Sequence, residues 1–334
     1  MCRHLGYLGP PAPVGALLTR GEHSLRSQAW QPRDMRGGGT INADGFGVAW
    51  WVPVVEAGGA SSTGDRARSR GPEAASARMA GRIGGRSPIT LAASRYRNPA
   101  PIWTDPAVDE VLPQLRSTAV LAAVRSATVG MPVERSACAP FTHGRWAFSH
   151  NGVVQDWQRV LTEVAAELGV ATLLDAESHT DSALLWVILR DLLEKLHEAA
   201  EFDRVPIASN GAAPAADGYA IAETPESWTL VADDWPESAA VPGRALRLLV
   251  SAVLARAPRA RLNLLLSDGE TLWATTVYHS LSVLATDTSV TLSSEPYDDD
   301  PRWQAIADRQ LVTARPGHLS VVPLASAESE RASS

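Results

Sequence analysis

An α+β fold with layered sheets is the fold class that the sequence predicts. Strand-like runs come first along the chain, helical periodicity follows, and short strand-like runs return towards the C-terminus. The chain has 334 residues, 45% of them hydrophobic, which is enough to bury a sizeable core. No solenoid-type repeat interrupts this order. The elements are therefore expected to pack as layers around shared cores.

Short runs rich in β-branched and aromatic residues predict the strands. Two of these runs flank Ser267-Asp268-Gly269-Glu270, and the Asp-Gly dipeptide tolerates the positive φ of a tight hairpin turn. We therefore expect an antiparallel pair on either side of this turn. The predicted strands are residues 46–52, 119–125, 145–149, 261–267, 271–277, 281–286 and 290–293.

Hydrophobic residues recur at i, i+3, i+4 and i+7 over 157–168 and again over 184–196, which predicts two amphipathic helices. Gly169 suits the end of the first helix. A third helix is predicted over 244–257. It ends there because Pro258 lacks the amide hydrogen that a helix needs and disfavours helical geometry in the preceding residue.

Two segments lack the apolar periodicity that a packed element needs. Residues 57–86 are rich in Gly, Ser, Ala and Arg, and residues 209–218 are rich in Ala, Gly and Pro. Both are predicted to be surface insertions or mobile loops. The last residues, 325–334, are predicted to form a frayed tail.

Composition argues against several classes of protein. The formal charge is -7, from 30 Lys and Arg against 37 Asp and Glu, so no basic surface for nucleic acid is expected. Two cysteines cannot build a disulfide framework, and no apolar run reaches the roughly 20 residues that span a bilayer. The N-terminus lacks the apolar core of a signal peptide. We therefore expect a cytoplasmic protein without a membrane segment, in which Cys2 is retained.

Cys2 is a candidate nucleophile because removal of Met1 would put a thiol and a free α-amine on one residue. An α-amine has an ordinary pKa of about 7.7–8.0 and a thiol one of about 8.5, so the amine can accept the thiol proton near neutral pH. The alternative is an inert thiol, because most cysteines are small buried residues.

Four further motifs occur in a fixed order, each at the edge of a predicted element. Together with Cys2 they resemble the class II, N-terminal-nucleophile glutamine amidotransferase family. The N-terminal MCRHLGYLG and the SEPYDDDPRW stretch near the C-terminus are most similar to one branch, the γ-glutamyl amidohydrolases of ergothioneine biosynthesis. The four motifs are NADGFG at 42–47, RSATVG at 125–130, SHNG at 149–152 and TDS at 180–182, and residues 293–301 extend the resemblance.

The resemblance implies a four-layer α/β/β/α sandwich and hydrolysis through a γ-glutamyl thioester on Cys2. The motifs spread from residue 2 to about 300, so residues 2–324 are expected to form a single domain, with water as the acceptor. In this branch the substrate would be the γ-glutamyl-cysteinyl sulfoxide conjugate of hercynine. The alternatives are a glutaminase subunit that supplies ammonia to a separate synthase, and a non-catalytic binding protein of the same fold.

The resemblance also implies roles for individual residues. The side-chain amide of Asn151 and the backbone N–H of Gly152 match the oxyanion hole, which acyl transfer requires; the alternative is a simple Asn-Gly hairpin turn. Arg125 matches the group that binds the substrate α-carboxylate and Asp181 the group that binds its α-ammonium, with Thr128 beside the carboxylate. A surface ion pair for Arg125 and a helix cap for Asp181 are the alternatives.

Other residues are expected to support the site without carrying the chemistry. Asn42 and Asp44 lie in a Gly-rich turn, where bonding to the backbone is at least as plausible as substrate contact, and His150 lies beside Asn151. Ser126, Gly38 and Ala139 depart from the usual family pattern. These departures affect the expected shape of the pocket.

No cofactor is expected, and the candidate metal ligands lack the spacing of a site. His4, His143, His150 and His179 form no paired motif, and Asp298-Asp299-Asp300 is more typical of a solvated turn. Cys138 is as readily a buried thiol as a functional one. The expected partner is a small γ-glutamyl substrate, and homo-oligomerisation is left open.

The trimethylammonium of hercynine requires an aromatic face or a carboxylate for its recognition, because it has no hydrogen to donate. The candidates are Trp30, Trp50, Trp51 and Trp103, near the first two motifs. At least one is expected to contact this cation together with an acid. The alternative is that these side chains fill cores and sheet faces.

Overall fold

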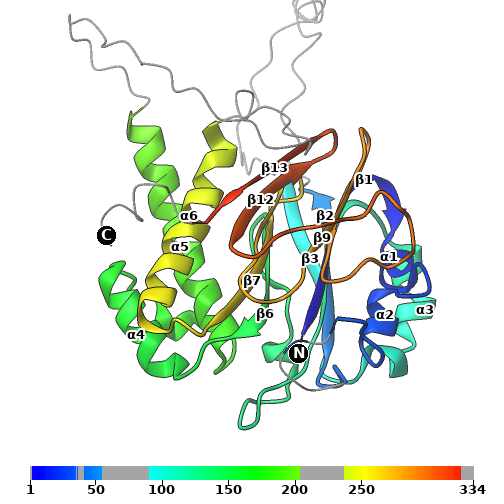
Figure 1. The fold of residues 1–334 in the computed structure, drawn as a ribbon, viewed down its shortest axis with the longest axis horizontal. Helices are drawn as coiled ribbons and strands as arrows, with labels where there is room; N and C mark the ends of the chain where they lie inside the picture. The colour runs from blue at the N-terminus through cyan, green and yellow to red at the C-terminus, as the bar shows by residue number, and fades with distance from the viewer. Residues whose placement is uncertain (1, 35, 37–40, 55–89, 204–236, 325–334) are drawn as a thin grey trace, which may run out of the picture.

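The structure is a computed structural model that describes residues 2–34, 36, 41–54, 90–203 and 237–324. Within these residues, two antiparallel β-sheets stack face to face, and each carries helices on its outer face (Figure 1). The order of layers is helices, sheet, sheet, helices, so the predicted four-layer sandwich is confirmed. The segments 57–86, 209–218 and 325–334 lie outside the described residues.

Sheet A contains the first strand of the chain as an interior strand, in the described order β11-β9-β10-β1-β4-β2-β3. β1 pairs with β4 on one side, where Arg3 lies opposite Val124, and with β10 on the other, where Leu5 lies opposite Ser293. Its strands are β1 (Arg3–Pro13), β2 (Phe46–Pro53), β3 (Leu91–Asn98), β4 (Arg116–Val124), β9 (Ser282–Ala285), β10 (Val290–Ser293) and β11 (Gln304–Ala305).

Sheet B is also antiparallel, in the described order β13-β12-β8-β7-β6-β5. The predicted Asp-Gly turn joins β7 to β8, and Gly269 adopts the positive φ of 91° that this turn requires. Its strands are β5 (Phe141–His143), β6 (Trp146–Val153), β7 (Arg261–Ser267), β8 (Leu272–Thr275), β12 (Gln310–Arg315) and β13 (His318–Pro323).

Three longer helices cover sheet B and three short ones cover sheet A, as far as the described residues go (Figure 1). None of these helices is both long enough and apolar enough to cross a membrane. The helices on sheet B are α4 (Trp157–Glu167), α5 (Asp181–Asp203) and α6 (Glu237–Arg256); those on sheet A are α1 (Val14–Thr19), α2 (Leu25–Gln28) and α3 (Ala107–Glu110). Single 3₁₀ turns are η1 (Ile102–Thr104), η2 (Leu112–Gln114), η3 (Arg135–Ala137) and η4 (Leu173–Asp175).

The structure corrects several predicted boundaries. The helix predicted over 184–196 begins earlier, at Asp181, and the helix predicted over 244–257 begins at Glu237 and includes Pro242. The strand predicted over 145–149 continues to Val153. The sequence did not predict β1, because Gly6, Gly9 and the prolines that follow normally indicate a turn or loop.

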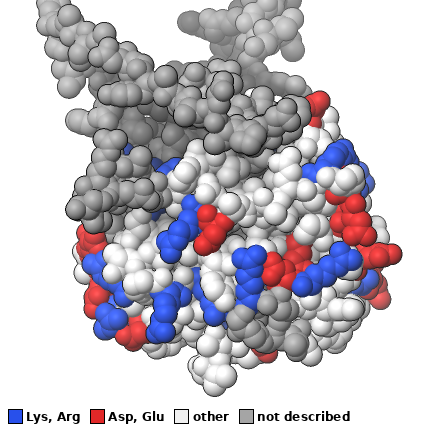
Figure 2. All heavy atoms as spheres, viewed as in Figure 1, with Lys and Arg blue, Asp and Glu red and all other residues white. Residues whose placement is uncertain are grey.

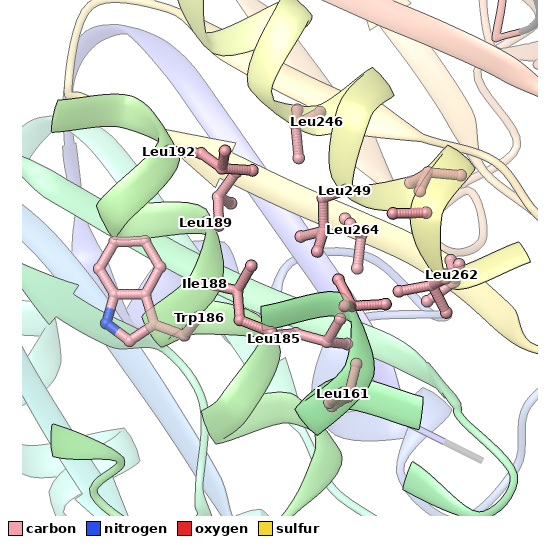
Figure 3. Packing of buried hydrophobic residues seen from close by; sticks show 14 of the residues in the cluster. Leu161, Leu185, Trp186, Ile188, Leu189, Leu192, Leu246, Leu249, Leu262 and Leu264 are labelled. Atoms are coloured by element: carbon pink, nitrogen blue, oxygen red, sulfur yellow. The ribbon is translucent and has the colours of Figure 1, made fainter. Parts of the chain in front are cut away.

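Buried side chains form three clusters, one in each space between adjacent layers. The largest joins sheet B to α4, α5 and α6, and Figure 3 shows Leu185, Ile188 and Leu189 of α5 meeting residues of α6 and β7. A second joins sheet A to its short helices, and a third fills the space between the sheets. Side chains alternate along β6, with Phe148 in the helix-facing cluster and Ala147 in the inter-sheet cluster.

The inter-sheet space is narrow because small residues line part of it. Ala49, Ala119 and Ala147 are completely buried there. A Cβ on Gly6 would lie 2.9 Å from the end of the Leu272 side chain in the opposite sheet, so a larger residue here would require that side chain to shift. On the outer surface seen in Figure 2, positive and negative side chains are interspersed.

A buried ion pair ties the start of β1 to the segment after β10. Arg3 Nε donates to Glu295 Oε1 at 2.9 Å, and both side chains are at most 4% exposed. Glu295 also accepts from the backbone N–H groups of Arg33 at 2.8 Å and Asp34 at 3.2 Å. Arg3 donates further to Cys2 O at 3.1 Å and Asp34 O at 2.6 Å. Both buried charges are therefore extensively hydrogen-bonded.

Glu295→Gln should lower the free energy of unfolding by about 3–5 kcal/mol, because it leaves the Arg3 guanidinium buried without a counter-charge. Urea denaturation measures this loss. Glu270→Gln is the control: Glu270 pairs with Arg145 at 2.6 Å, but the Glu270 side chain is 63% exposed, so a loss of less than about 1 kcal/mol is expected. Equal losses in the two variants would contradict a stabilising role for the buried pair.

Candidate active site

The start of β1 lies beside the end of β4 at one edge of the sandwich. Because Arg3 lies opposite Val124, the residues just beyond each strand, Cys2 and Arg125, are also neighbours. Cys2 is a partly exposed free thiol, and its Sγ lies 3.8 Å from Ser126 O. The structure thus brings together two of the residues that the sequence predicted as nucleophile and carboxylate-binding group.

A small hollow of about 20 Å³ lies beside Cys2. Arg125 lines it together with His150 and Ser182, so this space joins the end of β4 to β6 and to the start of α5. Cys2 and the residues of three separate chain segments therefore face a common space. With a volume of about 20 Å³, the hollow has room for little more than one water molecule.

Asn151 and Gly152 lie within β6, so the alternative of an Asn-Gly hairpin turn is wrong. A Cβ on Gly152 would collide with the carbonyl oxygen of Arg261 and lie 2.5 Å from His150 Nε2, so only glycine fits. The Leu262 N–H, opposite Gly152, donates to Val277 O on the far side of β7. Two residues directly opposite each other in an antiparallel pair either exchange both backbone hydrogen bonds or make neither. Because the Leu262 N–H points away from β6, the Gly152 N–H points away from β7.

Ser294 links Asn151 to the strand that follows Cys2. Its Oγ accepts from the backbone N–H of His4 at 3.0 Å and lies 3.4 Å from Asn151 Nδ2. Asn151 is buried, and its Oδ1 has no hydrogen-bond partner among the described residues. Sequence reasoning gave Ser294 no role, although it lies in the segment that extended the family resemblance.

Asp181 is the first residue of α5 and binds backbone groups there. Its Oδ1 accepts from Ser182 N at 2.7 Å and its Oδ2 from Val154 N at 3.0 Å. Asp181 therefore binds a backbone N–H at the start of the helix, as the helix-cap alternative expected. His150 Nε2 donates to Arg261 O at 2.9 Å, and its Nδ1 lies 3.0 Å from the Ser182 hydroxyl, which donates to Asp181 Oδ1 at 3.2 Å. Both side chains tie β6 to its neighbours.

Asp44 shapes the loop that carries Arg125. Its Oδ2 accepts from Ala127 N at 2.7 Å, and its N–H donates to Arg125 O at 3.0 Å. Asn42 is buried and donates from Nδ2 to Gln28 O at 3.2 Å, so it fixes the approach to β2. Both positions have the backbone-bonding role that the sequence analysis considered for them.

Thr128 lies on the surface. It is exposed, and its carbonyl accepts from Met131 N at 2.9 Å in a turn beyond the Arg125 loop. The structure therefore leaves Thr128 on the surface, whereas it brings Arg125 beside Cys2.

The tryptophan candidates fall into two groups. Trp51 is buried between the sheets and donates to Arg145 O at 2.7 Å, and Trp50 packs against the cluster beneath the short helices. Both fill packing layers. Trp30 and Trp103 form an edge-to-face pair with ring centroids 5.4 Å apart and remain partly exposed.

The described residues contain no cluster of three or more His, Cys, Asp or Glu arranged to hold a metal ion. Cys138 is buried behind the site, where its Sγ donates to Glu134 O at 3.4 Å, and burial raises the pKa of this thiol to about 11. Asp298 accepts from Trp303 Nε1 at 2.8 Å, and Asp300 pairs with Arg302, as expected for a solvated turn.

Two histidines are buried near the start of β1. His4 is 0% exposed and His279 is 4% exposed. Burial, reinforced by neighbouring positive charges that include Arg3, lowers the pKa of each to about 3. Both rings are therefore neutral at physiological pH. Sequence reasoning did not identify this pair.

Folding stability should fall as the pH drops from about 6.5 towards 3. In this range His4 and His279 bind protons in the unfolded chain but stay neutral in the folded protein. At pH 5 each histidine accounts for about 2 kcal/mol of this loss. Urea midpoints at pH 7 and pH 5 measure it. His279→Gln should show a smaller drop than the wild type, and exposed His143→Gln an unchanged one; equal drops in all three would refute the assignment.

Comparison with known proteins identifies full-length relatives. No family model matches the chain. It is 34% identical over 324 residues to the γ-glutamyl-hercynylcysteine sulfoxide hydrolase of Mycolicibacterium smegmatis, covering 97% of this chain and 100% of the relative. It is 33% identical over 332 residues to the protein of the same name from Mycobacterium tuberculosis, covering 99% and 100%.

Among solved structures, the fold is similar to that of the glutamine phosphoribosylpyrophosphate amidotransferase of B. subtilis, with a TM-score of 0.50 and 9% identity. The match covers 97% of this chain and 49% of that one, and it bears on the fold alone. The chain belongs to the family of γ-glutamyl-hercynylcysteine sulfoxide hydrolases.

Proposed function

We propose that this protein hydrolyses the γ-glutamyl amide bond of γ-glutamyl-hercynylcysteine sulfoxide in ergothioneine biosynthesis. The observation that carries the proposal is the near-full-length similarity to two hydrolases of that name, at 33–34% identity. The position of Cys2 beside Arg125 supports it, because a γ-glutamyl substrate needs a nucleophile and a cation within reach of one another. Both cysteines are free thiols, as expected in the reducing cytoplasm, where we propose that the reaction takes place.

The reaction begins with Cys2 at the N-terminus after removal of Met1. The α-amine accepts the thiol proton, and Sγ attacks the γ-carbonyl carbon to form a tetrahedral oxyanion. The C–N bond then breaks, and the amine product leaves with the proton that the α-amine returns. Water, deprotonated by the same amine, attacks the thioester, releasing glutamate and the thiol.

Asn151 and Gly152 are the proposed donors to the oxyanion. The Gly152 N–H points away from β7, on the same edge of β6 as the Val154 N–H, which bonds to Asp181. With the oxygen and nitrogen of the Asn151 amide exchanged, Ser294 accepts from His4 N–H and donates to Asn151 Oδ1. The amide N–H is then available to the oxyanion, and no buried carbonyl oxygen is left without a donor.

Recognition of the glutamyl half is assigned to Arg125 and Asp181. The Arg125 guanidinium can form a forked contact with the α-carboxylate. Asp181 lies near the same edge, where its Oδ2 is 4.0 Å from His150 Nδ1, and a carboxylate there suits the α-ammonium. Thr128, in the exposed turn that follows Arg125, is assigned a contact at the carboxylate end.

The test of the proposed function compares glutamate release from γ-glutamyl-hercynylcysteine sulfoxide and from glutamine by the purified protein. We expect kcat/KM for the conjugate to exceed that for glutamine by at least about 100-fold. Glutamine lacks the large leaving group of the conjugate, and the loss of two hydrogen-bonded contacts to that group lowers kcat/KM by roughly this factor. Cys2→Ala should abolish release while retaining the fold, whereas Cys138→Ala, which removes the other thiol, should retain activity. A preference for glutamine would favour an ammonia-supplying glutaminase, and active protein with Met1 retained would exclude the amine as base.

Asn151→Ala should lower kcat by about 10²–10³ with a smaller effect on KM, because an oxyanion donor acts in the transition state. Ser294→Ala should lower kcat by about tenfold, because it frees the Asn151 amide to rotate. In the double variant the Ser294 change should have no further effect. Ser293→Ala, on the adjacent residue, is the control; additive losses in the double variant would mean that Ser294 does not act through Asn151.

A further inference from the structure

A second cavity, of about 190 Å³, lies beside Ser294 on the opposite side of β1 from Arg125. Sheet A has the order β10-β1-β4; β4 leads into Arg125 and β10 into Ser294. Cys2, which precedes β1, therefore separates the two spaces. The residues that line the cavity are Arg33, Asp34, Arg36, Ser280, Leu281, Ser282, Ser294, Glu295, Pro296, Ala305 and Ile306.

Two side chains connect this cavity directly to the reacting groups. The buried guanidinium of Arg3 donates to Cys2 O at 3.1 Å and to Asp34 O at 2.6 Å, so it bridges the nucleophile and the cavity wall. Ser294 Oγ, in the opposite wall, lies 3.4 Å from Asn151 Nδ2. The cavity is thus one side chain away from both the nucleophile and the proposed oxyanion donor.

The charged groups of the wall differ in how firmly they are held. Glu295 is buried and accepts from Arg3 and from the N–H groups of Arg33 and Asp34, so its carboxylate serves the fold. The Arg33 and Arg36 side chains are 52% and 45% exposed. Their pairs with carboxylates are weak surface pairs that a ligand carboxylate can replace.

Arg36 is nonetheless held in place near the cavity. Its Nη1 donates to Tyr278 O at 2.8 Å, and its Nε and Nη2 contact the Asp34 carboxylate at 3.2 and 3.1 Å. Tyr278 has a positive φ of 85°, which is rare for an aromatic residue, and its N–H donates to Asp308 Oδ1 at 2.7 Å. The backbone that receives Arg36 is therefore fixed by specific contacts.

We propose that this cavity binds the amine leaving group, with Arg33 and Arg36 contacting its carboxylates; the inference rests on the proposed function. The leaving group of the conjugate carries one carboxylate on its cysteine half, another on its trimethylated histidine half, and a fixed positive charge. Two guanidinium groups match the two carboxylates, because their planar forks bind carboxylates through paired hydrogen bonds. Asp34 supplies the negative charge for the trimethylammonium.

The assignment also accounts for the tryptophan positions. Trp50 and Trp51 lie in packing layers, so they offer no face to a cation at the active site. Arg33, Arg36 and Asp34 instead provide a charged partner for each of the three charges of the leaving group. A γ-glutamyl amide whose leaving group lacks carboxylates would gain nothing from this cavity.

The experiment measures the ratio of kcat/KM for the conjugate to kcat/KM for γ-glutamyl-p-nitroanilide, whose leaving group carries no carboxylate. Arg33→Gln and Arg36→Gln should each lower this ratio about tenfold, mainly through KM for the conjugate. Arg36→Lys keeps the charge but loses the fork and should give an intermediate ratio. Arg26→Gln is the matched control, because Arg26 Nη1 contacts both carboxylate oxygens of Asp109 elsewhere on the surface, and its ratio should equal that of the wild type.

A wild-type-like ratio in both glutamine variants would overturn the assignment, and so would an equal fall for the two substrates, which would indicate a purely structural role. Inhibition by the free amine product gives a second readout: its inhibition constant should rise about tenfold in Arg36→Gln, and an unchanged constant would again overturn it. A different result would contradict the proposed function: a wild-type enzyme that does not prefer the conjugate over the anilide or glutamine.

Discussion

The buried ion pair between Arg3 and Glu295 is the constraint on which the geometry of the site depends. A nucleophile at the start of a chain faces a physical difficulty, because chain ends fray unless they are tied down. The guanidinium next to Cys2 is fixed by a carboxylate 292 residues away in sequence, and it also bonds to the carbonyl of Cys2 itself. Burying two charges costs several kcal/mol per ion unless both are well paired, and the surrounding backbone N–H and carbonyl groups meet that condition.

The interior position of β1 gives the nucleophile two neighbours of different chemistry. On one side β4 leads into Arg125, whose loop is shaped by Asp44; on the other β10 leads into Ser294. Sheet B supplies Asn151 from the facing layer. An amide substrate has two halves joined at the carbonyl under attack, so this arrangement lets one half lie on each side of Cys2. His4 and His279 are neutral and add no charge to this interior.

Sequence patterns predicted the elements whose signal is local. Helix α4 and the β7–β8 hairpin follow from periodicity and from a single Asp-Gly turn, and both are present. β1 was missed because its glycines and prolines are typical of loops, whereas Gly6 lies in a strand that packs closely against the Leu272 side chain of the other sheet. The resemblance carried by the family motifs placed Cys2, Arg125 and Asn151 in the predicted site. The roles of Ser294 and Glu295 depend on contacts with residues more than 100 positions away, which no local pattern contains.

Ser294 and Glu295 are consecutive in sequence, yet their side chains make contacts on opposite faces of sheet A. Successive side chains of an extended segment point to opposite faces, so neighbouring residues after β10 reach opposite faces of sheet A. Ser294 faces Asn151 between the sheets, whereas Glu295 meets Arg3, whose alternate neighbour Leu5 belongs to the cluster beneath the short helices. One residue can therefore orient the amide proposed as oxyanion donor while the next anchors the start of the chain. A one-residue shift in the pairing of β10 with β1 would exchange these faces and would disrupt both contacts at once.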